Sequence, residues 1–132
     1  MVLVHFDRDP LLGVISFRAR GHAGFAEHGS DIICAAISTL LQAAVFSLDT
    51  LFDLEAEHSI SEGSLNWSII ASPPVIPPEV KAILAHTLLA TMSIANSHPE
   101  HIHLTVSDLP QWQKAFLDSG SIQALKSMIY NA

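Results

Sequence analysis

Hydrophobic and polar positions divide the chain into short strands and two long helical stretches. Alternating apolar and polar residues are typical of a half-buried β-strand, and apolar residues repeating every three to four positions are typical of an amphipathic helix. Alternation and short β-type runs predict strands at Val2–Phe6, Gly13–Arg20, Leu54–Ile60, Leu65–Ser72 and His101–Val106. The helical repeat predicts one helix from Asp31 to about Phe52 and another from Pro78 or Glu79 to Asn96.

Turn-forming residues between these elements indicate how they connect. Asp7–Pro10 is expected to join the first two strands in a hairpin, Ser61–Ser64 to join the next pair, and Pro73–Pro78 to form a stiff connector. The resulting order, β-β-α-β-β-α-β, predicts an α+β fold in which two main helices pack on one side of a mainly antiparallel sheet.

The last part of the chain has a different pattern. Residues 108–132 contain two short amphipathic stretches, Gln111–Leu117 and Ser121–Tyr130, split at Ser119-Gly120. We therefore predict a main domain over residues 1–107 and a helical extension over 108–132 that packs on that domain or on a dimer partner.

Composition restricts the class of protein. The 132 residues are 49% hydrophobic and carry a formal net charge of −7, so one core is expected, direct nucleic-acid binding is disfavoured and basic protein partners are favoured. No uninterrupted apolar run reaches the roughly 18 residues of a membrane span, so no membrane contact is expected. The single cysteine excludes an internal disulfide, and its free thiol suits a reducing cytoplasm.

Candidate chemistry gathers around that cysteine, Cys34. Residues 21–30 hold three glycines and two histidines without any period, and they precede the predicted helix. With Ser30 or Asp31 as N-cap, Cys34 would lie in the first helical turn, where the helix dipole favours a thiolate. The free amides of that turn, around residues 33–35, would then be candidate donors to an oxyanion.

A thiolate nucleophile also needs a base. His22 is the first candidate and His28 its competitor, while Asp31 either orients His22 or only caps the helix. Ser38 shares a helix face with Cys34. Three glycines of this stretch allow turns, and they also allow a substrate backbone to approach closely: Gly21, Gly24 and Gly29. A simpler interpretation than catalysis is that Cys34, a lone cysteine on an apolar helix, is a small core residue.

A family resemblance favours the catalytic interpretation. Gly21-His22-Ala23, Gly29 and the run Asp31-Ile32-Ile33-Cys34-Ala35-Ala36-Ile37-Ser38 resemble the signature of the ribosomal-processing cysteine protease family, Prp. The resemblance extends to the order of elements over about residues 1–107. It implies an endopeptidase without a cofactor that removes the N-terminal extension of ribosomal protein bL27 after a large apolar residue. It also implies a catalytic dyad of His22 and Cys34, a substrate loop at 21–30, and a homodimer.

Two other functions remain open at this level. The same fold could act as a non-catalytic, ribosome-associated module that grips a basic segment without cutting it. A metal site is the other alternative, because His98, His101 and His103 cluster, and the last two would face the same side of a strand. No third ligand is specified beyond that pair, so no metal is expected.

Overall fold

Among the described residues, seven regular elements follow one another in the order that the sequence predicts. The computed structural model describes residues 1–9, 12–21, 28–70 and 76–107. Its elements are β1 (Val2–Asp9), β2 (Gly13–Arg20), α1 (His28–Leu51), β3 (Ala56–Ser61), β4 (Ser64–Ile69), α2 (Pro78–Ser97) and β5 (Ile102–Val106). The predicted helical extension at 108–132 lies outside the described residues.

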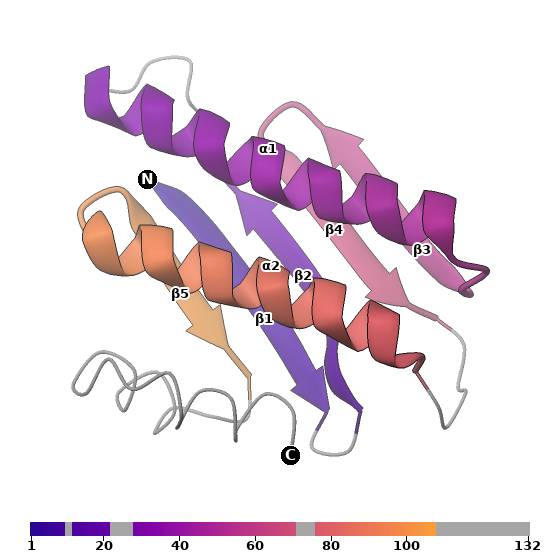
Figure 1. Ribbon diagram of the computed structural model, residues 1–132. Coiled ribbons are helices and arrows are strands. Elements are labelled where there is room, and N and C mark those ends of the chain that lie inside the picture. Colours follow the sequence, from indigo (N-terminus) through magenta and orange to yellow (C-terminus); the bar gives the residue numbers. More distant parts are fainter. Residues whose placement is uncertain (10–11, 22–27, 71–75, 108–132) are drawn as a thin grey trace.

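The strands form one sheet in the order β3-β4-β2-β1-β5. β1 with β2, β2 with β4 and β3 with β4 are antiparallel pairs, whereas β5 lies parallel to β1 at the edge. Both helices lie side by side on the same face of this sheet (Figure 1). The prediction of an α+β fold with two helices on one side of a mainly antiparallel sheet is confirmed.

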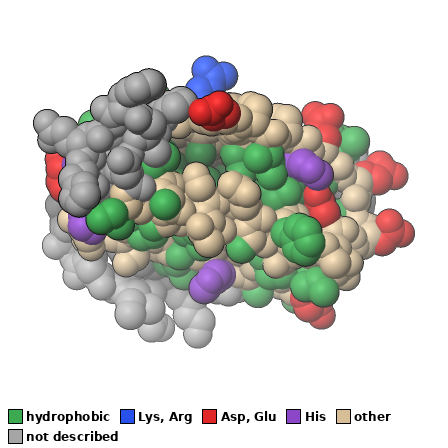
Figure 2. All heavy atoms as spheres, turned by 90° about the horizontal axis from the view of Figure 1, so that it is seen from above, with side chains coloured by type: hydrophobic (Ala, Val, Ile, Leu, Met, Phe, Trp, Pro, Cys, Tyr) green, Lys and Arg blue, Asp and Glu red, His purple; other side chains and the backbone are tan. Residues whose placement is uncertain are grey.

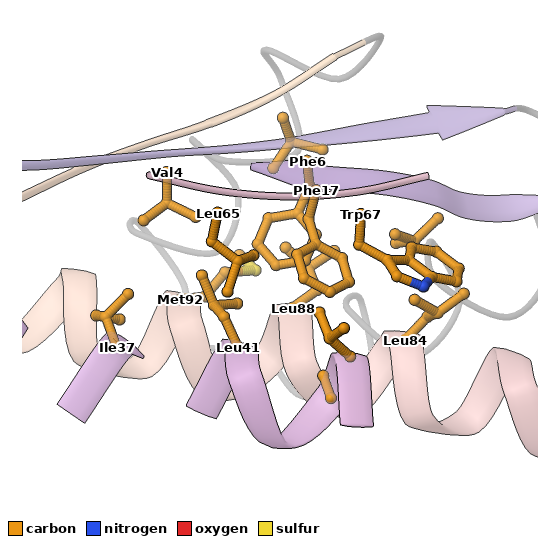
Figure 3. Packing of buried hydrophobic residues seen from close by; sticks show 14 of the residues in the cluster. Val4, Phe6, Phe17, Ile37, Leu41, Leu65, Trp67, Leu84, Leu88 and Met92 are labelled. Atoms are coloured by element: carbon orange, nitrogen blue, oxygen red, sulfur yellow. The ribbon is translucent and has the colours of Figure 1, made fainter. Parts of the chain in front are cut away.

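The core is built on a row of aromatic side chains that crosses the middle of the sheet. Phe6, Phe17 and Trp67 are paired neighbours on β1, β2 and β4, and all three side chains are at most 1% exposed. Their ring centroids lie 5.6 and 5.5 Å apart, within the range of favourable aromatic contacts. Leucines from α1 and α2 close over these rings from the helical layer (Figure 3). The row therefore joins the sheet to both helices.

Several predicted boundaries are wrong. β3 begins at Ala56 instead of Leu54, and β4 ends at Ile69 instead of Ser72. Two further differences affect the hairpin and the site. β1 continues through the predicted turn to Asp9, because Asp7, Arg8 and Asp9 still pair with β2. α1 begins at His28 instead of Asp31. Residues 28–30 contain no proline, and the one glycine there costs a helix only about 1 kcal/mol, so the backbone continues as helix beyond the expected cap.

The far face of the sheet is polar and holds a small hydrogen-bond network around Asp7. Ser16 donates to one carboxylate oxygen at 2.7 Å, and the Nε2 of His5 lies 3.0 Å from the other. Partial burial opposes ionisation, but the hydrogen bonds from Ser16 and His5 outweigh it and lower the pKa of Asp7 below its usual range. Asp7 therefore stabilises the fold above the pH at which an unfolded aspartate ionises, and this contribution is lost as the pH falls through its folded pKa.

Replacing Ser16 with alanine tests this network. The variant should lose about 0.5–1 kcal/mol of unfolding free energy at pH 7. A value in the lower part of this range is expected, because Asp7 is partly exposed and water screens its charge. The difference from the unmodified protein should shrink as the pH is lowered through the folded pKa of Asp7. Urea unfolding at a series of pH values measures this difference in unfolding free energy. A difference that stays constant down to pH 2 would show that Ser16 does not stabilise the ionised form of Asp7.

Candidate active site

Cys34 lies on the inner face of α1 and is only 9% exposed. Its side chain nevertheless lines a pocket of about 360 Å³ at one end of the sheet. A buried thiol that opens onto a pocket meets a requirement of nucleophilic catalysis, because a substrate can reach it while bulk water is largely kept away. The position is therefore compatible both with a core residue and with a nucleophile, and the pocket favours the second.

The pocket has an apolar wall and a polar rim. The wall comes from α1 and from the ends of β1, β2, β3 and β4: Val2, Ala19, Ile37, Leu41, Ile60 and Leu65. The rim carries neutral and charged groups: Arg20, Gly21, Ser38, Gln42, Ser61, Glu62, Gly63 and Ser64. This arrangement is typical of a site that holds an apolar side chain of a bound peptide and fixes the backbone of that peptide by polar contacts.

Position 21, at the rim of the pocket, requires a glycine because of its backbone conformation and its close contacts. Its φ of +151° is a conformation that other residues rarely adopt, and a Cβ there would meet the Met1 carbonyl oxygen and the Val2 Cα at 2.8 Å. Its N–H donates to the carbonyl oxygen of Gly63 at 3.1 Å. Gly21 therefore lets the end of β2 pass closely beside the start of β1 and holds it to the turn of the β3–β4 hairpin.

The early start of α1 changes the expected environment of the thiol. Cys34 is the seventh helical residue, not the third, so it lies beyond the first turn in which the helix dipole acts. The amides of residues 33–35 are inside the helix, where each bonds to the carbonyl four residues earlier, so they are not free donors for an oxyanion. Asp31 lies within the first turn of α1 and is not the N-cap. These three expectations are wrong.

The other predicted site residues divide into three groups. Ser38 lies one turn after Cys34 and lines the same pocket, as its helical spacing predicts. Gly29, Asp31 and the alternative base His28 belong to the backbone of α1. His22 and Gly24 lie outside the described residues, although Gly21, the residue directly before His22, is part of the pocket rim.

Sequence reasoning missed the contribution of the β3–β4 hairpin. Ile60 and the turn residues Ser61, Glu62, Gly63 and Ser64 all line the pocket. The pattern predicted this hairpin, but only the pairing of β4 with β2 brings its turn beside Gly21. A single sequence gives no signal for that contact, since it joins residues about forty positions apart.

The proposed histidine cluster does not form a metal site among the residues that the structure describes. No group of three His, Cys, Asp or Glu side chains there is placed to hold an ion. His101 precedes β5 in a turn, so it does not alternate along a strand with His103 as expected. His98 and His101 instead lie 3.9 and 3.5 Å from a carboxylate oxygen of Glu100.

Comparison with known proteins assigns this chain to a class. Residues 1–103 match the family model described as cysteine protease Prp. A ribosomal processing cysteine protease Prp from Bacillus subtilis is 25% identical over 99 residues, covering 72% of this chain and 88% of the relative. Another, from Mycoplasma genitalium, is 36% identical over 86 residues, covering 64% of this chain and 80% of the relative.

Solved structures agree with the fold. The crystal structure of SMU.848 from Streptococcus mutans matches with a TM-score of 0.71 and 28% identity, over 80% of this chain and 93% of that one. Prp from Staphylococcus aureus, solved with a substrate peptide, matches with a TM-score of 0.70 and 22% identity, over 81% of this chain and all of that one. The fold is therefore that of a cysteine protease family. This chain belongs to the ribosomal processing cysteine protease family Prp.

Proposed function

We propose that the chain is a cysteine endopeptidase that removes the N-terminal extension of ribosomal protein bL27, with Cys34 as nucleophile and His22 as base. The observation that carries the proposal is the pocket shared by Cys34 and Gly21, because Gly21 directly precedes His22 in the sequence. The enzyme uses no cofactor and works in a reducing cytoplasm, where its lone thiol stays free.

The chemistry follows from these two groups. His22 takes the proton of Cys34, and the sulfur attacks the scissile carbonyl carbon to give a tetrahedral oxyanion. The intermediate collapses to a thioester as the C–N bond breaks, and the imidazolium gives its proton to the leaving amine. Water, deprotonated by the same imidazole, then hydrolyses the thioester and releases the N-terminal fragment and the thiol.

The pocket supports a large apolar residue before the cut. Ile37, Leu41 and Leu65 give it an apolar wall deep beside Cys34, while Ile60 is 47% exposed at its mouth. A phenylalanine side chain bound there would remove apolar surface from water on both partners. The net charge of −7 favours encounter with a basic ribosomal protein, so the substrate class agrees with both features.

Cleavage of a synthetic bL27 peptide tests the function. The peptide should carry the extension with Phe before the cut, and matched peptides should carry Ala or Asp at that position. One cut after Phe, identified by the masses of both products, is expected, with slower cleavage of the Ala peptide and none of the Asp peptide. Saturable binding of the Phe peptide without any product would instead indicate the non-catalytic binding module.

The identity of the base can be decided with two histidine variants. His22→Ala should lower kcat/KM by about 10²–10⁴-fold, because that is the usual contribution of a positioned general base. His28→Ala serves as the matched control and should stay within about tenfold of the unmodified enzyme, since it removes an imidazole that takes no part in proton transfer. Rates for the Phe peptide measure both, and a larger loss in His28→Ala would reverse the assignment.

The exposed side of α1 supports a homodimer. Its stretch Ile32–Leu51 has a mean hydropathy of 1.8 and is long and apolar enough to cross a membrane by length and composition alone, yet only 33% of it is buried. Ile32, Phe46 and Leu51 are 65%, 74% and 67% exposed. Figure 2, which looks onto the α1 side, shows hydrophobic side chains along the middle of this face and acidic ones toward its right-hand rim.

The surface between the two helices has the shape of a contact site. A groove of about 380 Å³ runs between α1 and α2, and small or neutral residues such as Ala43, Ser47 and Ala82 line it. Small residues allow a second helix to approach closely, and exposed apolar patches of this kind mark interaction sites. Because the inner face of α1 already packs on the sheet, we assign the outer face to a second copy of the chain and not to a bilayer.

Replacing Phe46 with glutamate tests this interface. The unmodified protein should have the mass of a dimer by light scattering after size exclusion, and Phe46→Glu should have the mass of a monomer, because the charge cannot be buried there without a partner. Ile70→Glu is the matched control, since Ile70 is 59% exposed and lies directly after β4 instead of on α1, and it should remain dimeric. A monomeric unmodified protein, or a dimeric Phe46→Glu, would contradict the assignment.

A further inference from the structure

A second hollow lies on the face of the sheet that the helices leave open. It has a volume of about 450 Å³ and includes two guanidinium groups, two imidazoles, an amide and a hydroxyl: Arg18, Arg20, His5, His103, Asn66 and Thr105. Among the residues that the structure describes, no carboxylate lines it. Its residues come from β4, β2, β1 and β5, so the hollow crosses four neighbouring strands.

Strand register explains why these groups converge. Arg18 and Arg20 are two residues apart on β2, so both side chains point away from the helices and lie about 7 Å apart along the strand. Arg18 has Asn66 beside it on one neighbouring strand and His5 on the other. Thr105 follows one strand further on, where its hydroxyl hydrogen-bonds the Nδ1 of His5 at 2.5 Å and fixes that ring.

The positive charge of this hollow is only partly balanced by the described carboxylates nearby. Within the part of the chain that the structure describes, neither Arg18 nor Arg20 has a carboxylate within the 4.0 Å of a salt bridge. Arg18 does act on Asp7 through space, but that carboxylate is already held by Ser16 and His5. Two exposed guanidiniums side by side repel each other, and this arrangement on a chain of net charge −7 favours an anion between them.

We propose that this hollow, which we call the outer pocket, binds a small phosphate-type dianion between Arg18 and Arg20. Guanidinium groups bind phosphate oxygens in pairs of parallel hydrogen bonds, and the side-chain amide of Asn66 adds a further donor. The volume lies in the range of small-molecule sites. A nucleic-acid strand fits less well, because its other phosphates would meet an acidic protein surface. The proposal is independent of the proteolytic function.

Binding of inorganic phosphate to the full chain tests the proposal. Amide shifts should be followed by NMR at constant ionic strength, with chloride as the balancing anion. Saturable shifts on β4, β2, β1 and β5 are expected. Arg18→Gln should weaken binding by about tenfold or more, because it removes a charge-assisted hydrogen-bonding group. Arg18 is chosen because it does not line the pocket of Cys34, whereas Arg20 lines both.

A matched control and a competing ligand make the outcome decisive. Lys81→Gln removes one positive charge from α2, on the other side of the sheet, and should leave phosphate binding unchanged. Shifts that do not saturate, that lie elsewhere, or that persist at the same midpoint in Arg18→Gln would overturn the proposal. So would a ten-nucleotide single-stranded RNA that binds the outer pocket more tightly than phosphate at the same salt concentration.

Discussion

Replacing Cys34 with alanine should lower kcat/KM for the extended bL27 peptide by about 10⁴-fold or more, the scale of loss when a covalent nucleophile is removed. The chain has no second cysteine, so no other thiol can take over the attack. The substitution removes one buried sulfur and should cost little stability, so the variant remains folded and able to bind the peptide. Rates under single-turnover conditions measure the chemical step.

Ser38→Ala is the control for this loss. Ser38 lines the same pocket one helical turn away, so its removal perturbs the site without removing the nucleophile. Its kcat/KM should stay within about tenfold of that of the unmodified enzyme, because the loss of a neutral hydroxyl costs less than the loss of a charged or covalent group. If Cys34→Ala still cut the peptide at the normal rate, or if Ser38→Ala were the inactive variant, the assigned nucleophile would be wrong.

Replacing Phe17 with alanine should have the largest effect on stability, about 3–5 kcal/mol of unfolding free energy. Phe17 is 1% exposed, and its ring touches both Phe6 and Trp67, so its loss opens a cavity in the middle of the aromatic row. A domain of this size has only about 5–15 kcal/mol in total, so the variant should be near the limit of folding.

Urea unfolding followed by tryptophan fluorescence measures this effect. Trp67 lies in direct contact with Phe17, so its emission reports on the same part of the core. Ile70→Ala is the control: Ile70 is 59% exposed, and its loss should cost less than about 1 kcal/mol. A cost of about 1 kcal/mol or less for Phe17→Ala would show that the aromatic row is not the centre of the core.

Local patterns predicted more of the fold than of the site. Alternation along β2 places Phe17 inside and Arg18 outside, and the structure agrees. The same pattern cannot say that β2 lies between β1 and β4, or that β5 joins β1 in parallel, because those pairings are long-range. The outer pocket and the hairpin side of the Cys34 pocket depend on this order, so neither could be derived from periodicity.

The start of α1 shows a second limit of sequence reasoning. Ser30 and Asp31 are good capping residues, yet the helix begins before them, since capping preference is a local term that further helical turns can outweigh. Placement in the first turn is therefore not what makes Cys34 a candidate nucleophile. Its helical position is not the first turn, and what marks it structurally is the pocket that it shares with Gly21 and Ser38.

Affinity labelling of the thiol tests the central claim most directly. A peptide chloromethyl ketone that carries the bL27 extension and ends in Phe should alkylate the protein once, with the adduct on Cys34 by tandem mass spectrometry. Loss of peptide cleavage should follow labelling in proportion, and excess bL27 peptide should protect against both. An adduct on another residue that abolishes cleavage, or full cleavage by protein fully labelled at Cys34, would contradict the account.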